Sequence, residues 1–234
     1  MLRAVEGERV ERLGAWIGVA FVVLLFASTG MVSSPAADVA DLKVARFYGD
    51  HRSAVAIAQV VGLLAAPLLI WFAVRLHRLV RPSPAQPDGA ASATLVAGVA
   101  VALASVATSV PLLVLLLRAG GGRFLRDPAG AGALFDAGNL ADNALFVAAA
   151  LFIGVGSAAL ARSGLCRSWV PWVGGALAVL AGARGIVGFA NGSEAGALDV
   201  IGPLSFVVFV LLAAAAMAGW RFVRAPEAVP ATPA

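Results

Sequence analysis

The sequence has few of the side chains that hold metals, haems and disulfides. It contains one cysteine, Cys166, and two histidines, His51 and His77. A single cysteine excludes an internal disulfide, and two histidines cannot provide bis-histidine ligation for two haems. No Cys/His cluster has the spacing of a zinc site. We therefore predict neither metal nor cofactor, and we expect Cys166 to be a plain small residue rather than an activated thiolate.

Charge and catalytic motifs are also scarce. Charged residues make up 13% of the chain, and seventeen Lys and Arg stand against thirteen Asp and Glu. The basic residues lie at the ends of apolar segments, a pattern that sets membrane topology, so we expect no nucleic-acid partner. The segment 191–194 lacks the Gly-x-Ser-Gly context and partner histidine of an intramembrane serine protease. We predict that the chain is not an enzyme.

What the chain has in abundance is apolar sequence. Hydrophobic residues account for 61% of it, and the mean hydropathy is +0.93. A helix needs about 20 apolar residues to cross the hydrocarbon core of a bilayer. Six segments meet this length, and they begin near Leu13, Ala54, Ala91, Asn143, Trp169 and Val200. Their long apolar runs lack the alternation of a barrel strand.

We therefore predict an all-α, polytopic transmembrane bundle with six spans. One membrane domain, residues 1–223, is followed by a disordered cytoplasmic tail, residues 224–234. Short helices on the outer face are expected before the second and fourth spans. In the first of these Ser34 would cap a helix with Pro35 in its first turn, and in the second Asp127 would cap a helix beginning at Pro128. We expect the helix near Pro35 to lie along the membrane surface.

The distribution of basic residues predicts that both termini are cytoplasmic. Ten basic residues fall on the side of the N-terminus: Arg3, Arg9, Arg12, Arg75, Arg78, Arg81, Arg162, Arg167, Arg221 and Arg224. Six fall on the other side: Lys43, Arg46, Arg52, Arg118, Arg123 and Arg126. We expect the bacterial cytoplasmic membrane. In an alternative interpretation, residues 15–27 form the core of a cleaved signal peptide, which would leave five spans.

Polar residues within the spans gather near their outer ends. The hydroxyl residues among them are Ser28, Thr29, Ser105, Thr108 and Ser109. Arg184 lies about a turn and a half from the outer end of the fifth span, and a charge at this depth requires a partner. Asp142 is the nearest acid in depth, with Asp136 and Asp199 as alternatives. Gly14 and Gly18 have a spacing that lets helices pack closely, and we expect packing inside the bundle rather than dimerisation.

The residues Asp136, Asn139 and Asn143 are spaced so that they share one helix face. We predict that this face points inward, towards Arg184 and Gln59. Two interpretations follow. The cluster is either a water-filled vestibule in which Arg184 anchors an anionic ligand, or a packing ion pair between Arg184 and Asp142. The candidate ligand-binding residues are Arg184, Asp142, Asn143, Asn139, Gln59 and Asp136.

Two motifs carry a resemblance. The Tyr-x-Asp-His-Arg run at 48–52 leads into a helix containing Trp71 and Phe72, and a short loop of the type Gly-Leu-x-x-x-Trp-x-x-Trp-x-Gly spans 164–174. Together they resemble a family of actinobacterial six-helix integral membrane proteins of unknown function, over residues 10–223. That family's loop has proline where this chain has Cys166. The resemblance implies six helices and offers no activity, substrate or site.

Two functions remain open from the sequence. One is a protein of the cytoplasmic membrane that binds or moves a small-molecule or lipid ligand, anionic in character, through the outward-facing polar cluster. The other is a structural or regulatory membrane subunit that acts through a protein partner, or as a homo-oligomer. An exposed stripe of small residues together with a closed Arg184–Asp142 pair would favour the second.

Overall fold

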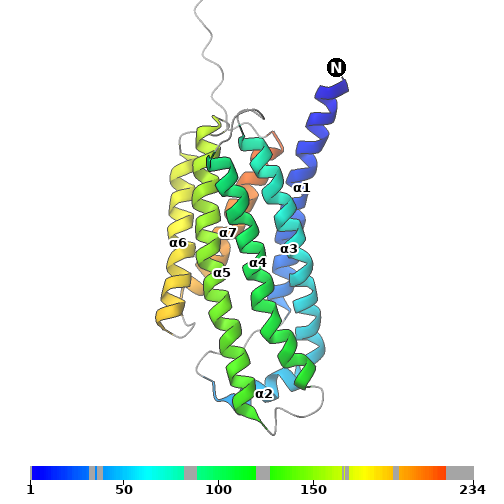
Figure 1. The fold of residues 1–234 in the computed structure, drawn as a ribbon, viewed down its shortest axis with the longest axis vertical. Helices are drawn as coiled ribbons and strands as arrows, with labels where there is room; N and C mark the ends of the chain where they lie inside the picture. Colours follow the sequence, from blue (N-terminus) through cyan, green and yellow to red (C-terminus); the bar gives the residue numbers. More distant parts are fainter. Residues whose placement is uncertain are drawn as a thin grey trace, which may run out of the picture.

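The computed structural model describes residues 2–31, 35, 39–81, 89–119, 127–164, 166, 169–191 and 195–219, with the side chains of 2–12 and 119 excepted. These residues form seven α-helices and no strand (Figure 1). The helices are α1 (Leu2–Gly30), α2 (Asp41–Asp50), α3 (Arg52–Val80), α4 (Gly89–Ala119), α5 (Pro128–Arg162), α6 (Val170–Ala190) and α7 (Leu198–Met217). The predicted tail, residues 224–234, lies outside the described residues.

Six of these helices are long and apolar enough to cross a membrane, and only α2 is not. Their outward surfaces are apolar: Val96, Leu117, Leu151 and Val179 are all more than half exposed. Large exposed apolar side chains on every side of a bundle are expected where lipid is the solvent. The chain is thus an all-α, multi-pass membrane protein, as the hydropathy predicts.

The six long helices form a closed ring in the order α1, α3, α4, α5, α6, α7, with α7 packing back on α1. Each helix therefore packs against its neighbours in the sequence of spans, as Figure 1 shows for the antiparallel helices α3, α4, α5 and α6. The helices α3 and α6 do not pack against each other. This order decides which polar side chains can meet.

The axis of the ring is filled by aromatic side chains. Phe72 of α3 and Phe152 of α5 are fully buried, and Phe209 of α7 meets Phe152 edge to face with ring centroids 5.4 Å apart. A Cβ added at Gly18 of α1 would lie 2.7 Å from Phe72, so this glycine lets α1 approach the core. Gly14, one turn earlier, also faces α3. The prediction that these two glycines serve packing within the bundle is confirmed.

The long helices of the ring differ in length. At about 1.5 Å per residue, α5 with its 35 residues is roughly 52 Å long, whereas α6 with 21 is roughly 32 Å. Figure 1 shows α4 and α5 extending beyond α6 at the lower end, where α2 packs. Asp127 caps α5 by accepting a hydrogen bond from the backbone N–H of Gly130 at 3.2 Å, as predicted. The helix expected before the fourth span is thus continuous with that span.

The position of α2 corrects one sequence prediction. The helix begins at Asp41, and Pro35, expected in its first turn, is not helical. Val44, Ala45 and Tyr48 are buried, whereas Leu42 is exposed. This face packs on α4 and α5 through residues that include Leu115, Leu116 and Phe135. The projecting ends of α4 and α5 therefore give α2 a protein surface to cover.

Candidate functional site

The polar layer predicted at one depth separates into two kinds of residue. The hydroxyl groups bond to their own helix: Ser28 donates to the carbonyl of Leu25 at 2.8 Å, and Thr108 donates to that of Ser105 at 2.7 Å. Ser109 also donates to Ser105, at 3.3 Å. Such local bonds satisfy a hydroxyl without any neighbouring helix. These residues therefore do not converge on a site.

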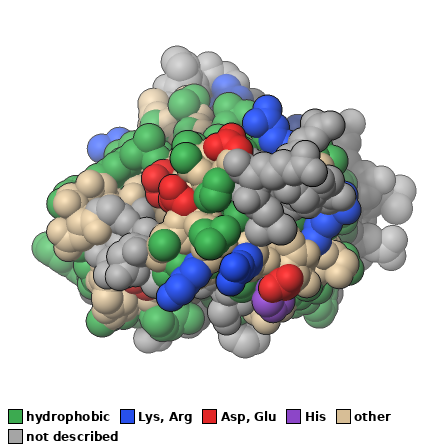
Figure 2. Space-filling model, turned by 90° about the horizontal axis from the view of Figure 1, so that it is seen from below, with side chains coloured by type: hydrophobic (Ala, Val, Ile, Leu, Met, Phe, Trp, Pro, Cys, Tyr) green, Lys and Arg blue, Asp and Glu red, His purple; other side chains and the backbone are tan. Residues whose placement is uncertain are grey.

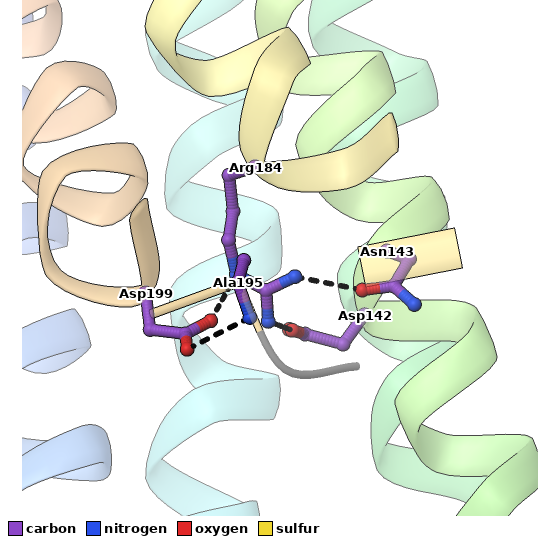
Figure 3. Close-up of polar contacts among 5 residues, drawn as sticks. All are labelled: Asp142, Asn143, Arg184, Ala195 and Asp199. Carbon is purple, nitrogen blue, oxygen red and sulfur yellow. Dashed lines mark hydrogen bonds and ion pairs between the residues drawn. The ribbon is translucent and has the colours of Figure 1, made fainter. Parts of the chain in front are cut away.

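Arg184 is the residue on which a site does converge. It lies on α6, and its guanidinium points at α5 (Figure 3). Nη1 donates a hydrogen bond to Oδ1 of Asn143 at 2.8 Å, and Nη2 donates to Oδ2 of Asp142 at 3.2 Å. Asp142 and Asn143 are adjacent in sequence, so one turn of α5 binds both ends of the guanidinium. The predicted pairing of Arg184 with Asp142 is confirmed.

A second carboxylate completes the cluster from α7. Oδ1 of Asp199 lies 2.6 Å from Nε of Arg184. The separation is that of an ion pair, but Nε has no acceptor aligned as a hydrogen bond. Oδ2 of Asp199 accepts from the backbone N–H of Ala195 at 3.2 Å, which fixes the carboxylate in the first turn of α7. Arg184 thus joins α5, α6 and α7.

Burial divides the cluster into a closed centre and an open edge. The side chain of Arg184 is 8% exposed, whereas those of Asp142 and Asp199 are 40% and 41% exposed. The ring of Phe146 lies against the guanidinium, 5.0 Å from its Cζ, and adds a cation–π contact. The cation is therefore enclosed by its partners. With two carboxylates to one guanidinium, the cluster has a formal charge of −1.

Two glycines make room for this arrangement. A Cβ added at Gly202 of α7 would lie 2.8 Å from both Cβ and Cγ of Arg184. A Cβ added at Gly188 of α6 would collide with Oδ1 of Asn143 and Nη1 of Arg184. Both glycines are buried. The close approach of α5, α6 and α7 around Arg184 therefore depends on positions without a side chain.

The other predicted site residues lie apart from Arg184. Gln59 is on α3, which does not pack against α6, so the expectation that it faces Arg184 is wrong. Asp136 is exposed and Asn139 is half-buried, and neither bonds to Arg184. Of the face formed by Asp136, Asn139 and Asn143, only Asn143 reaches the guanidinium. Equal depth along the helices predicted a common layer, but the ring order decides which members meet.

Groups suited to metal or nucleophile chemistry are not assembled in the described part of the chain. No group of three His, Cys, Asp or Glu residues there could hold a metal ion. Cys166 lies between α5 and α6, and burial raises the pKa of its thiol above the ordinary value. A raised pKa disfavours the thiolate, which is the reactive form. Cys166 thus has the surroundings of a structural residue.

Comparison with known proteins adds no relative. No family model matches the chain, and neither a curated protein nor a solved structure matches it. The resemblance of the 48–52 and 164–174 motifs to six-helix actinobacterial proteins therefore stays a prediction. Any function has to be argued from the bundle and its polar cluster.

Proposed function

We propose that this chain is a non-enzymatic membrane subunit that acts through contact with a protein partner, or with further copies of itself, in the bacterial cytoplasmic membrane. The observation that carries the proposal is the filled axis of the ring. Phe72 and Phe152 are fully buried there, and Phe209 is nearly so. Protein interiors packed to this degree leave no continuous passage for a solute. A protein that carries a solute through the bundle would need to open this core. A subunit that acts through contacts on its outer surface would not.

The Arg184 cluster supports the same proposal. The guanidinium is already paired with two carboxylates, so the cluster has a formal charge of −1 and an anionic ligand would have to displace a carboxylate. Breaking such a buried pair leaves an uncompensated charge and is costly. The cluster therefore acts as a tie between α5, α6 and α7. It holds these three helices in one arrangement, so that the bundle presents the same outer surface to a partner.

Cysteine accessibility tests the closed axis. In a Cys166→Ser background, we would introduce Ala149→Cys or Ala213→Cys, both at fully buried core positions, and treat membrane vesicles with a small membrane-impermeant maleimide. We expect no labelling from either side. Ala133→Cys, on the exposed side of α5 where it projects, is the matched control and should be labelled when its side of the vesicle is accessible. Labelling of the core positions would contradict the proposal.

A second candidate function is favoured by the open edge of the cluster. Asp142 and Asp199 are each about two-fifths exposed, so the cluster can be reached from outside the bundle. A small or lipidic anionic ligand would have to displace one carboxylate from Arg184. Native mass spectrometry in mild detergent, with wild type beside Arg184→Ala, separates the candidates. A bound species held by wild type and lost in the variant would favour the ligand site, and the absence of any such species would favour the tie.

A further inference from the structure

The residue that caps the end of α6 is an asparagine followed by a glycine, Asn191 and Gly192. Asn191 is exposed, and α6 ends at the α2 end of the bundle, the end against which α2 packs. Figure 2 views this end, where acidic and basic side chains are exposed. The sequence has two other asparagines, Asn139 and Asn143, and both lie inside α5. Asn191 is therefore the only one of the three that is exposed at a helix end.

An asparagine followed by a glycine is prone to a reaction with its own backbone. The backbone nitrogen of the following residue loses its proton and attacks Cγ of the asparagine, so that a five-membered ring forms and the side-chain amide nitrogen leaves as ammonia. Water then opens the ring to aspartate or isoaspartate. In sum, asparagine and water give a carboxylic acid and ammonia. A following glycine favours the attack because it has no Cβ to hinder the ring and its backbone is the least restricted.

The backbone of Asn191 is held by the helix on one side only. Its N–H donates a hydrogen bond to the carbonyl of Val187 at 2.9 Å, which closes the last turn of α6. In a continuing helix the N–H of Ala195 would donate to the carbonyl of Asn191. That N–H donates instead to Oδ2 of Asp199 at 3.2 Å. The carbonyl side of Asn191 therefore lacks the helical bond that fixes peptide groups inside α5.

The product of this reaction would place a new charge on the Arg184 face of α6. Asn191 follows Arg184 by seven residues, or about two turns, so the two lie on one helix face about 10 Å apart along the axis. The Arg184 cluster already has a formal charge of −1. The end of α6 also disfavours an anion, because the C-terminus of a helix carries the negative end of its dipole. A carboxylate at this position is therefore repelled by both.

We propose that Asn191 is a site of spontaneous deamidation, and that the resulting carboxylate destabilises the end of α6 next to the Arg184 cluster. The only co-reactant is water, which reaches the exposed end of the helix. The inference goes beyond the proposed function, because the reaction depends on the backbone of Asn191 and not on any partner. It also separates Asn191 from the two asparagines of α5, whose peptide groups are held in a helix.

Peptide mass spectrometry of the full-length protein, incubated in detergent at neutral and at mildly alkaline pH, tests the reaction. We expect the peptide with Asn191 to gain the mass difference between an amide and an acid, faster at the higher pH because the attacking nitrogen must lose its proton. Asn139 and Asn143 are internal controls and should stay unmodified. Gly192→Ala should slow the reaction severalfold, because its Cβ hinders the ring. Equal rates at the three asparagines, or an unchanged rate in Gly192→Ala, would overturn the proposal.

Two further variants test the effect of the new charge. Asn191→Asp carries the carboxylate from the start and should unfold in detergent at a lower temperature than wild type. Asn191→Gln keeps an uncharged amide at the exposed end of α6, so it should unfold like fresh wild type. It should also stay unmodified, because its longer side chain would have to close a larger ring. Equal unfolding temperatures for Asn191→Asp and Asn191→Gln would overturn the effect on α6, even if Asn191 reacts.

Discussion

Two arginines of this protein lie within spans at opposite ends of the bundle and differ in what surrounds them. Arg184 bonds to Asp142 and Asn143 and forms an ion pair with Asp199. Arg75 forms no ion pair with a described residue, and its aliphatic part packs against α1. Arg184 links three helices through charged groups, whereas the contact of Arg75 with α1 is one of packing. A charged residue in a membrane helix is therefore not by itself a sign of a ligand site. The residues that contact it decide whether it stabilises the fold.

The largest effect on stability should come from removing Arg184, which links α5, α6 and α7. Arg184→Ala leaves Asp142 and Asp199 without their cation, and we expect it to lower the free energy of unfolding by about 3 kcal/mol. The measurement is thermal or denaturant unfolding in detergent micelles. Arg118→Gln, an exposed position at the end of α4, is the control and should change stability by less than about 0.5 kcal/mol. Equal effects of the two variants would remove the distinction between Arg184 and a surface charge.

A smaller effect on stability should come from filling the space next to Arg184 that Gly202 leaves open. In Gly202→Ala the new Cβ meets the stem of Arg184, so α6 and α7 must separate, at a cost of about 1–3 kcal/mol. Gly175→Ala, on the same helix as Arg184, adds a methyl group in open space and should be neutral or slightly stabilising. Unfolding of both variants under the conditions used for Arg184→Ala gives the comparison. A neutral Gly202→Ala would mean that the cluster tolerates a wider helix spacing.

The α2 end also contains a neutral buried group whose ionisation can be followed. Burial raises the pKa of Tyr48 from its ordinary value of 10.0 to about 12. The unfolded chain ionises first, so stability is complete below pH 10 and falls as the pH rises from 10 to 12, by at most about 2.7 kcal/mol. Comparing wild type with Tyr48→Phe over this range isolates the effect. An identical pH dependence in the two proteins would show that Tyr48 does not contribute.

The smallest effect on stability should come from Arg75. In delipidated protein Arg75→Met removes a donor that has no partner and keeps most of the apolar stem, so stability should change by less than about 1 kcal/mol. This near-neutral result, set beside the large effect of Arg184→Ala, would sharpen the contrast between the two arginines. Unfolding in lipid-free detergent is the measurement. A loss as large as that of Arg184→Ala would show that Arg75 has a structural partner.

The six spans could be predicted from sequence because lipid requires long apolar helices, and composition alone identifies them. The Asp127 cap and the packing role of Gly14 and Gly18 could also be predicted, since they depend on local rules. The pairing of helices could not. Gln59 was expected near Arg184 because both lie at similar depth, yet α3 and α6 are not neighbours. Depth gives the position of a residue along the membrane normal only. The order of the helices around the ring decides which residues meet, and the sequence pattern does not contain that order.

The same limit explains the outcome for Arg184. Its need for a carboxylate follows from the cost of a charge within a span, and Asp142 and Asp199 were both among the candidates. That it binds both follows from α6 packing between α5 and α7. The surroundings of α2 could not be predicted for a related reason. The helix was expected along the membrane surface, but it packs on the projecting ends of α4 and α5 through Val44, Ala45 and Tyr48.

The most direct test of the account is a double-mutant cycle on Arg184 and Asp142. Unfolding free energies would be measured in the same detergent for wild type, Arg184→Gln, Asp142→Asn and the double variant. If the pair ties α5 to α6, each single variant is destabilised and the double variant loses less than their sum, with a coupling of about 1–3 kcal/mol. Additive losses, or single variants as stable as wild type, would contradict the central claim that this ion pair fixes the bundle.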